Sequence, residues 1–260
     1  MRATTAGCLL SVLITISAGC VGDSSPASPD VAVPGGSAVA LADSVRRIDL
    51  PANFPIKKIL CFGDSVTFGV TQQYGGSGGA RPVLTTVEGY IPKLWRLLEE
   101  RYGTGFELVN EGIGGENTTE GLDRIDTMIR RHEPDLILIM EGIVDVNNEF
   151  ARFPVVRFNL AEMMRIGILR GKFVISGTYL PANPDGFRVF AVENITRLND
   201  VIRQEAKGKN VPIADHEVAA PKGFRGVGSD GLHPNNLGYE TMAQVWFESI
   251  VEMLEGLGVT

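Results

Sequence analysis

Hydrophobic residues from position 56 onward follow two alternating patterns. Short apolar runs rich in β-branched residues predict strands, and longer segments with apolar residues every three or four positions predict helices. The expected strands are 57–62, 106–110, 135–140, 173–179 and 211–214. The expected helices are 88–102, 117–132, 159–170, 191–207 and 236–256. Nearly continuous apolar strands separated by helices predict an α/β protein: a three-layer α/β/α sandwich around a five-stranded parallel sheet.

The loops after the first three expected strands have unusual compositions. Ser65 follows the first strand in the stretch CFGDSVTFG, residues 110–115 (NEGIGG) follow the second, and residues 141–145 (EGIVD) follow the third. Ligands of parallel α/β sheets lie outside the carboxyl ends of the strands. The coincidence of these loops favours a functional site there, although Gly, Asp and Ser are also common in ordinary turns and helix caps.

Residues 1–20 differ in composition from the rest of the chain. Arg2 precedes an uncharged segment rich in Leu, Val and Ile that ends in small residues, which predicts a secretory signal rather than a first core helix. Cys20 follows Ala18-Gly19 and resembles the lipidated cysteine of the bacterial lipobox, with Ser17 at the position where leucine is usual. We therefore expect export and attachment to a membrane surface through lipid on Cys20.

Residues 21–53 predict a flexible tether, because their first twenty positions are dominated by Gly, Ser, Pro and Ala and cannot bury a core. The remainder, 54–260, predicts one folded domain. No 18-residue apolar span follows residue 20. Cys61, on an expected strand, predicts a small buried hydrophobe, and no disulfide framework is available.

The net charge of −7 argues against a nucleic-acid partner, which requires a concentrated basic surface. Glycine-rich residues 112–119 (GIGGENTT) do not fit the phosphate-binding loop patterns, and a simple helix start is an alternative reading for them. The histidines and cysteines do not have the usual metal-ligand spacings. We therefore expect no cofactor.

Three histidines are present. His132 closes an expected helix, where a structural role is favoured, and His216 follows the fifth strand and indicates a structural or surface residue. His233 lies three residues after Asp230, with Gly231 allowing a bend between them. This spacing lets the carboxylate accept the Nδ1–H of the imidazole and leaves Nε2 available as a base, although the same residue types also form simple turns.

A serine hydroxyl becomes a useful nucleophile when a base lies beside it and an acceptor orients that base. Ser65, His233 and Asp230 supply these three groups, and the glycine-rich loop at residues 112–119 supplies backbone N–H groups that can hold an oxyanion.

The blocks GDSVTFG, VNEGIGGENTT, EGIVD and DGLHPN resemble those of the GDSL, or SGNH, serine hydrolases over about residues 56–256. The resemblance implies a flavodoxin-like three-layer sandwich and an esterase. It implies Ser65 as nucleophile, Gly115 as an oxyanion donor, and Asp230 with His233 as the rest of a catalytic triad. The implied substrates are carboxylic esters, with export favouring acetylated glycans or lipid esters.

One block departs from the family pattern Gly-x-Asn-Asp, because Val144 stands where an asparagine usually donates to the oxyanion. Three readings follow: two backbone donors suffice, Asn147 or Asn148 substitutes, or activity is reduced. The alternative function is therefore a catalytically weakened surface lipoprotein that binds glycans. Residues 70–87, rich in glycine, predict a mobile rim over the site.

Overall fold

The computed structural model describes residues 48–75, 79–84 and 89–259. The expected signal segment, Cys20 and the tether up to residue 47 lie outside the described residues. Residues 48–50, part of the expected tether 21–53, pair with the domain: the Leu50 N–H donates to the Thr104 carbonyl, and the Thr104 N–H donates to the Ile48 carbonyl, both at 2.9 Å. The folded unit therefore begins before residue 54.

The central sheet has five parallel strands in the order β4-β1-β5-β6-β7. The strands are β1 (Lys58–Gly63), β4 (Glu107–Gly112), β5 (Leu136–Met140), β6 (Phe173–Gly177) and β7 (Ile213–Ala214). This order confirms the expected five-stranded parallel sheet and is the flavodoxin-like one, in which successive connections leave β1 in opposite directions. The crevice at such a switch point lies beside the carboxyl end of β1.

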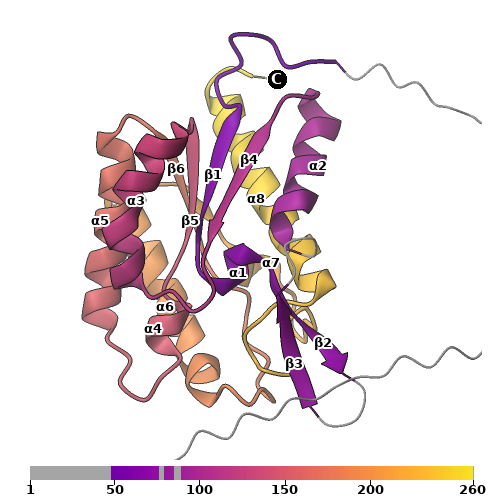
Figure 1. Cartoon of the computed structure of the whole chain (residues 1–260), viewed down its shortest axis with the longest axis vertical. Coiled ribbons are helices and arrows are strands. Elements are labelled where there is room, and N and C mark those ends of the chain that lie inside the picture. The colour runs from indigo at the N-terminus through magenta and orange to yellow at the C-terminus, as the bar shows by residue number, and fades with distance from the viewer. Residues whose placement is uncertain (1–47, 76–78, 85–88, 260) are drawn as a thin grey trace, which may run out of the picture. The chain divides into compact units, whose positions relative to one another are not determined.

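Helices cover both faces of the sheet, which confirms the three-layer prediction (Figure 1). One face carries α2 (Tyr90–Tyr102) and α8 (Asn236–Gly256), and the other carries α3 (Thr118–His132), α5 (Phe153–Leu169) and α6 (Val189–Gly208). Helix α5 begins at Phe153 rather than near residue 159, because Pro154 lies in its first turn, where proline fits a helix. None of the helices among the described residues is long and apolar enough to cross a membrane.

Several short elements were not expected from the sequence. The described residues include the one-turn helices α1 (Ser65–Phe68), α4 (Ile143–Val146) and α7 (His216–Ala219). The segment expected to form a glycine-rich rim contains two antiparallel strands, β2 (Val70–Gly75) and β3 (Gly79–Leu84). One helical turn is too short to give a hydrophobic period, and the glycines between β2 and β3 obscure the strand pattern.

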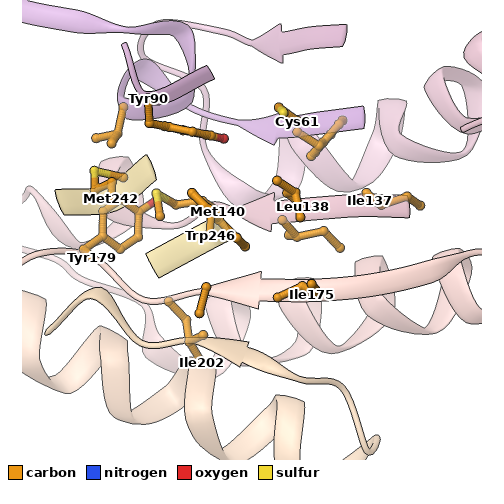
Figure 2. Packing of buried hydrophobic residues seen from close by; sticks show 14 of the residues in the cluster. Cys61, Tyr90, Ile137, Leu138, Met140, Ile175, Tyr179, Ile202, Met242 and Trp246 are labelled. Carbon is orange, nitrogen blue, oxygen red and sulfur yellow. The ribbon is translucent and has the colours of Figure 1, made fainter. Parts of the chain in front are cut away.

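The core lies between the sheet and its two helical layers. All five residues of β5 are buried, and the ring centroids of Tyr90 and Trp246 lie 6.0 Å apart in the layer that α2 and α8 form over the sheet (Figure 2). Cys61 on β1 is also buried, as predicted. Burial raises the pKa of the Cys61 thiol to about 12, so the group stays a neutral thiol.

His216 is a buried structural residue and not a surface one. Its Nδ1 lies 2.6 Å from the Thr178 carbonyl oxygen, and its ring packs edge-on against Trp246 at 5.0 Å between centroids. Burial lowers the pKa of His216 to about 4, so the imidazole is neutral at physiological pH.

We expect His216 to make the free energy of unfolding depend on pH. In the unfolded chain its imidazole binds a proton near pH 6.5, whereas its folded pKa is about 4. Between these values the unfolded state binds more protons, so the His216 contribution to stability falls as pH falls, by at most about 3 kcal/mol.

Urea unfolding of the wild type and a His216→Gln variant at pH 7 and pH 4.5 measures this contribution. Glutamine keeps an N–H donor for the Thr178 carbonyl but does not titrate, so the variant should lose less stability on acidification. Equal losses in the two proteins would contradict a neutral buried imidazole.

Candidate active site

The turn after β1 places Ser65 at the carboxyl edge of the sheet. The Asp64 carboxylate caps α1 by accepting the Val66 N–H at 2.9 Å, so the chain turns into a helix directly at Ser65. As the first residue of α1, Ser65 has an N–H with no acceptor inside the helix. Ser65 is buried, with 7% of the residue's surface exposed.

Three of the residues predicted from sequence meet at this edge. His233 Nε2 lies 2.9 Å from Ser65 Oγ, and His233 Nδ1 lies 2.5 Å from Asp230 Oδ2. Ser65 and His233 are 168 positions apart in the chain, so the tertiary fold alone brings them together. An imidazole in this position can take the hydroxyl proton while the carboxylate orients the ring.

The loop carrying Asp230 is tightly bent, as the sequence predicts. Asp230 Oδ1 accepts the N–H groups of Leu232 and His233, each at 3.0 Å. Gly231, between Asp230 and Leu232, has φ +91°, a left-handed conformation that L side chains rarely adopt. The bend returns the chain so that one carboxylate holds both the backbone and the side chain of His233.

Arg188 also binds Asp230, and the sequence analysis did not identify it. Its Nε donates to Asp230 Oδ2 at 3.2 Å, the oxygen that faces His233 Nδ1, and its backbone N–H donates to the Asp230 carbonyl at 2.9 Å. Burial alone would raise the pKa of Asp230, but the hydrogen bonds and charge of His233 and the backbone N–H groups outweigh it and hold that pKa below its usual value. Asp230 is therefore ionised across the neutral range.

Asp64 has a second partner besides the helix it caps. The Tyr179 hydroxyl donates to Asp64 Oδ2 at 2.5 Å, which joins the end of β6 to the turn before Ser65. Burial raises the pKa of Asp64 to about 6, while the bonds from Tyr179 and Val66 favour the ionised form and limit this rise. No local sequence pattern pairs two residues that are 115 positions apart.

A second buried carboxyl lies close to Asp64. Glu141, at the end of β5, is fully buried, and no donor among the described residues reaches either of its oxygens. Burial, followed by the charges of Asp64 and Glu116, holds the pKa of Glu141 well above its usual range, which favours the neutral acid. Glu116 is held by Arg124 Nε and Nη2, both at 2.5 Å.

The glycine-rich loop after β4 lies beside α1. The Ile113 N–H donates to the Gly63 carbonyl at 2.9 Å, and a Cβ added at Gly112 would lie 2.2 Å from the Phe68 backbone nitrogen. Only a glycine permits this close approach of the loop to the helix that begins at Ser65. Gly115, three residues further on, is exposed on the same loop. Asn117 then caps α3, so the helix-start reading of this segment is also correct.

The block that carries Val144 forms α4, directly after β5. Val144 is partly buried and packs against the core. Asn148 is exposed, its side chain donates to the Asp145 carbonyl at 2.6 Å, and its own side-chain oxygen accepts the Phe150 N–H at 2.8 Å. These bonds hold the Asn148 side chain within its own turn, which leaves Asn147 as the better candidate for a substitute donor.

His132 makes a local contact at the end of its helix. His132 ends α3, as expected, and its Nε2 lies 2.7 Å from Glu111 Oε1. In the part of the chain that the structure describes, no group of three or more His, Cys, Asp or Glu side chains is arranged to hold a metal ion.

The hydrogen-bonded serine, histidine and aspartate side chains at the carboxyl ends of this flavodoxin-like sheet have the arrangement that serine hydrolases use. The sequence model of the GDSL-like lipase/acylhydrolase family matches residues 61–241, and the chain belongs to that family.

The individual relatives and the solved structure described next share 24% to 27% sequence identity with this chain. A multidomain esterase of Ruminococcus flavefaciens is 27% identical over 243 residues, covering 82% of this chain but only 31% of that relative. Esterase TesA of Pseudomonas aeruginosa is 27% identical over 161 residues, covering 62% of this chain and 77% of TesA. The crystal structure of a lipase/acylhydrolase from Enterococcus faecalis matches with a TM-score of 0.64 at 24% identity, over 76% of this chain and 97% of that one, which supports the fold.

Proposed function

We propose that this protein hydrolyses acyl or acetyl esters through a catalytic triad of Ser65, His233 and Asp230. Ser65 Oγ attacks the ester carbonyl carbon while His233 Nε2 takes the hydroxyl proton, and Asp230 stabilises the imidazolium that forms. His233 then returns the proton to the leaving alcohol oxygen, and an acyl-enzyme remains on Ser65. Water, deprotonated by His233, releases the acid. The observation that carries this proposal is the pair of contacts at 2.9 Å and 2.5 Å that join the three side chains.

The oxyanion of the tetrahedral intermediate is assigned to the N–H groups of Ser65 and Gly115. The Ser65 N–H has no acceptor inside α1, and the loop that carries Gly115 is hydrogen-bonded to the end of β1 through Ile113. Fixed donors directed at developing negative charge are among the largest contributions to catalysis of acyl transfer.

The substrate class is a small ester or an ester on a glycan or lipid. Esterase relatives and the family assignment support the acyl chemistry, and the expected export signal favours substrates outside the cytoplasm. The competing proposal is a weakened hydrolase that binds glycans at the same edge, and Val144 is the observation that favours it.

Replacement of the triad residues should abolish turnover of p-nitrophenyl acetate. Ser65→Ala and His233→Ala should each reduce kcat by about a thousandfold or more, because triad members act as a unit. Ser249→Ala, which removes a serine hydroxyl that donates to the Val245 carbonyl on α8, serves as the control and should leave kcat unchanged. Fluorophosphonate labelling should follow the same order. Equal turnover by the wild type and Ser65→Ala would favour the glycan-binding alternative.

Val144→Asn should raise kcat about tenfold or more if the site lacks one oxyanion donor, following the usual effect of such donors. The effect should fall on kcat more than on KM, because the new N–H₂ group meets charge that develops only in the transition state. Steady-state kinetics of Val144→Asn and of Val144→Ala, which alters volume without adding a donor, test this.

A stable Val144→Asn variant with unchanged kcat would show that the position is already served. Asn147→Ala would then be expected to lower kcat, and Asn148→Ala would not, because the Asn148 amide is bound within its turn. If kcat is unaffected at all three positions, this loop does not contact the oxyanion.

We also propose that the protein is exported and anchored by lipid on Cys20. The supporting observation is the signal-like segment that ends in Ala18-Gly19-Cys20. Cys20→Ser should abolish incorporation of an alkyne-tagged fatty acid and release the protein from membranes. Cys8→Ser, in the same segment, is the matched control and should still be labelled. Labelling that persists in Cys20→Ser would refute the anchor.

A further inference from the structure

We infer that Arg188 is a positioning residue for the Asp230–His233 pair, and that its charge extends ester hydrolysis to lower pH. The inference rests on the proposed triad. Arg188 meets Asp230 twice, through Nε to Oδ2 at 3.2 Å and through its backbone N–H to the Asp230 carbonyl at 2.9 Å. The side chain of Asp230 is fully buried, whereas that of Arg188 is 31% exposed.

The contact geometry fixes which oxygen of the carboxylate faces the imidazole. Backbone N–H groups of Leu232 and His233 hold Oδ1, while Arg188 Nε and His233 Nδ1 share Oδ2. A carboxylate held on both oxygens cannot rotate away from the ring. Arg188 itself immediately precedes α6, so its backbone is held by a long helix that packs against the core.

The guanidinium also changes the electrostatic field at the imidazole. An ionised aspartate favours the imidazolium form of a neighbouring histidine, and a cation on the same carboxylate oxygen offsets part of that effect. His233 must be unprotonated to accept the Ser65 proton. A cation at Asp230 therefore favours the reactive form of the base in acidic solution.

Other charged and titratable groups face the same pair. Asp64 interacts with His233 from the turn before Ser65, and Tyr239 interacts with Asp230 from α8. Asp64 has a pKa of about 6 and so titrates in the pH range of interest, whereas burial raises the pKa of Tyr239 well above its usual value. Neither group is altered in the Arg188 variants, so a comparison among these variants tests the guanidinium.

The test is the pH dependence of kcat/KM for p-nitrophenyl acetate in three variants at position 188. Arg188→Gln and Arg188→Met remove the charge, and glutamine retains a side-chain N–H donor. In both variants, the pH at which kcat/KM falls to half its maximum on acidification (the midpoint of the acid limb) should rise by about half a pH unit to one unit. The partial exposure of the guanidinium limits the size of this shift. Arg188→Lys retains the charge and should keep the midpoint close to that of the wild type.

Arg157→Gln is the matched control, because it removes one positive charge from the outer surface of α5, where Arg157 pairs with Glu205 at 3.2 Å. Its acid limb should coincide with that of the wild type. An unchanged limb in Arg188→Gln and Arg188→Met, or an equal shift in Arg157→Gln, would overturn the inference. So would failure of both uncharged variants to fold while Arg188→Lys folds, since Arg188 would then act only in stability. Absence of Ser65-dependent turnover in the wild type would instead overturn the proposed function, and this inference with it.

Discussion

The buried carboxylate of Asp64 is the contact on which the geometry of the candidate site depends. Asp64 follows β1 and caps α1, and this cap sets the direction that the chain takes away from the sheet at Ser65. Its other oxygen receives the Tyr179 hydroxyl from the end of β6, two strands away in the sheet. A helix of four residues has little stability of its own, so its position is determined by these contacts rather than by helix propensity.

The carboxyl groups around this edge show how one protein gives the same chemical group different charges. Asp230 is held by backbone N–H groups, an imidazole and a guanidinium, and its pKa falls below the usual value although burial opposes this. Glu141 has no donor among the described residues and its pKa rises. Neither side chain is exposed, and the difference follows from their surroundings: burial and the charges of Asp64 and Glu116 raise the pKa of Glu141, whereas hydrogen bonds and the charge of His233 lower that of Asp230. Ionised and neutral acids can thus coexist near one serine.

The sequence was sufficient to predict the regular part of the fold. Strands such as β5 are continuous apolar runs, and long helices such as α3 carry a clear period and an Asn117 cap, so their existence follows from local pattern. The short helices α1, α4 and α7 do not, since one turn shows no period. The strands β2 and β3 were missed because their glycine-rich surroundings indicated a rim.

The candidate site likewise contains residues that the sequence predicts and residues that only the tertiary structure reveals. Asp230 and His233 are close in sequence, and the family resemblance marks Ser65, so their meeting was predictable. Arg188 and Tyr179 contact these groups only because distant strands end at the same edge, and neither has a local signal. Contacts of this kind can be predicted only once the fold is known.

The entry of the chain into the domain has a mechanical consequence. Residues 48–50 pair with Thr104, which precedes β4, so the chain joins the sheet at the amino ends of its strands. Ser65 follows β1 at the carboxyl ends of the strands, and Figure 1 shows α1 at the opposite end of β1 from this entry point. A force applied to the chain at Ile48 would therefore act at the amino ends of the strands, which are remote from Ser65. The backbone contacts of Leu50 and Thr104 would carry such a force before it reached β1 and Ser65.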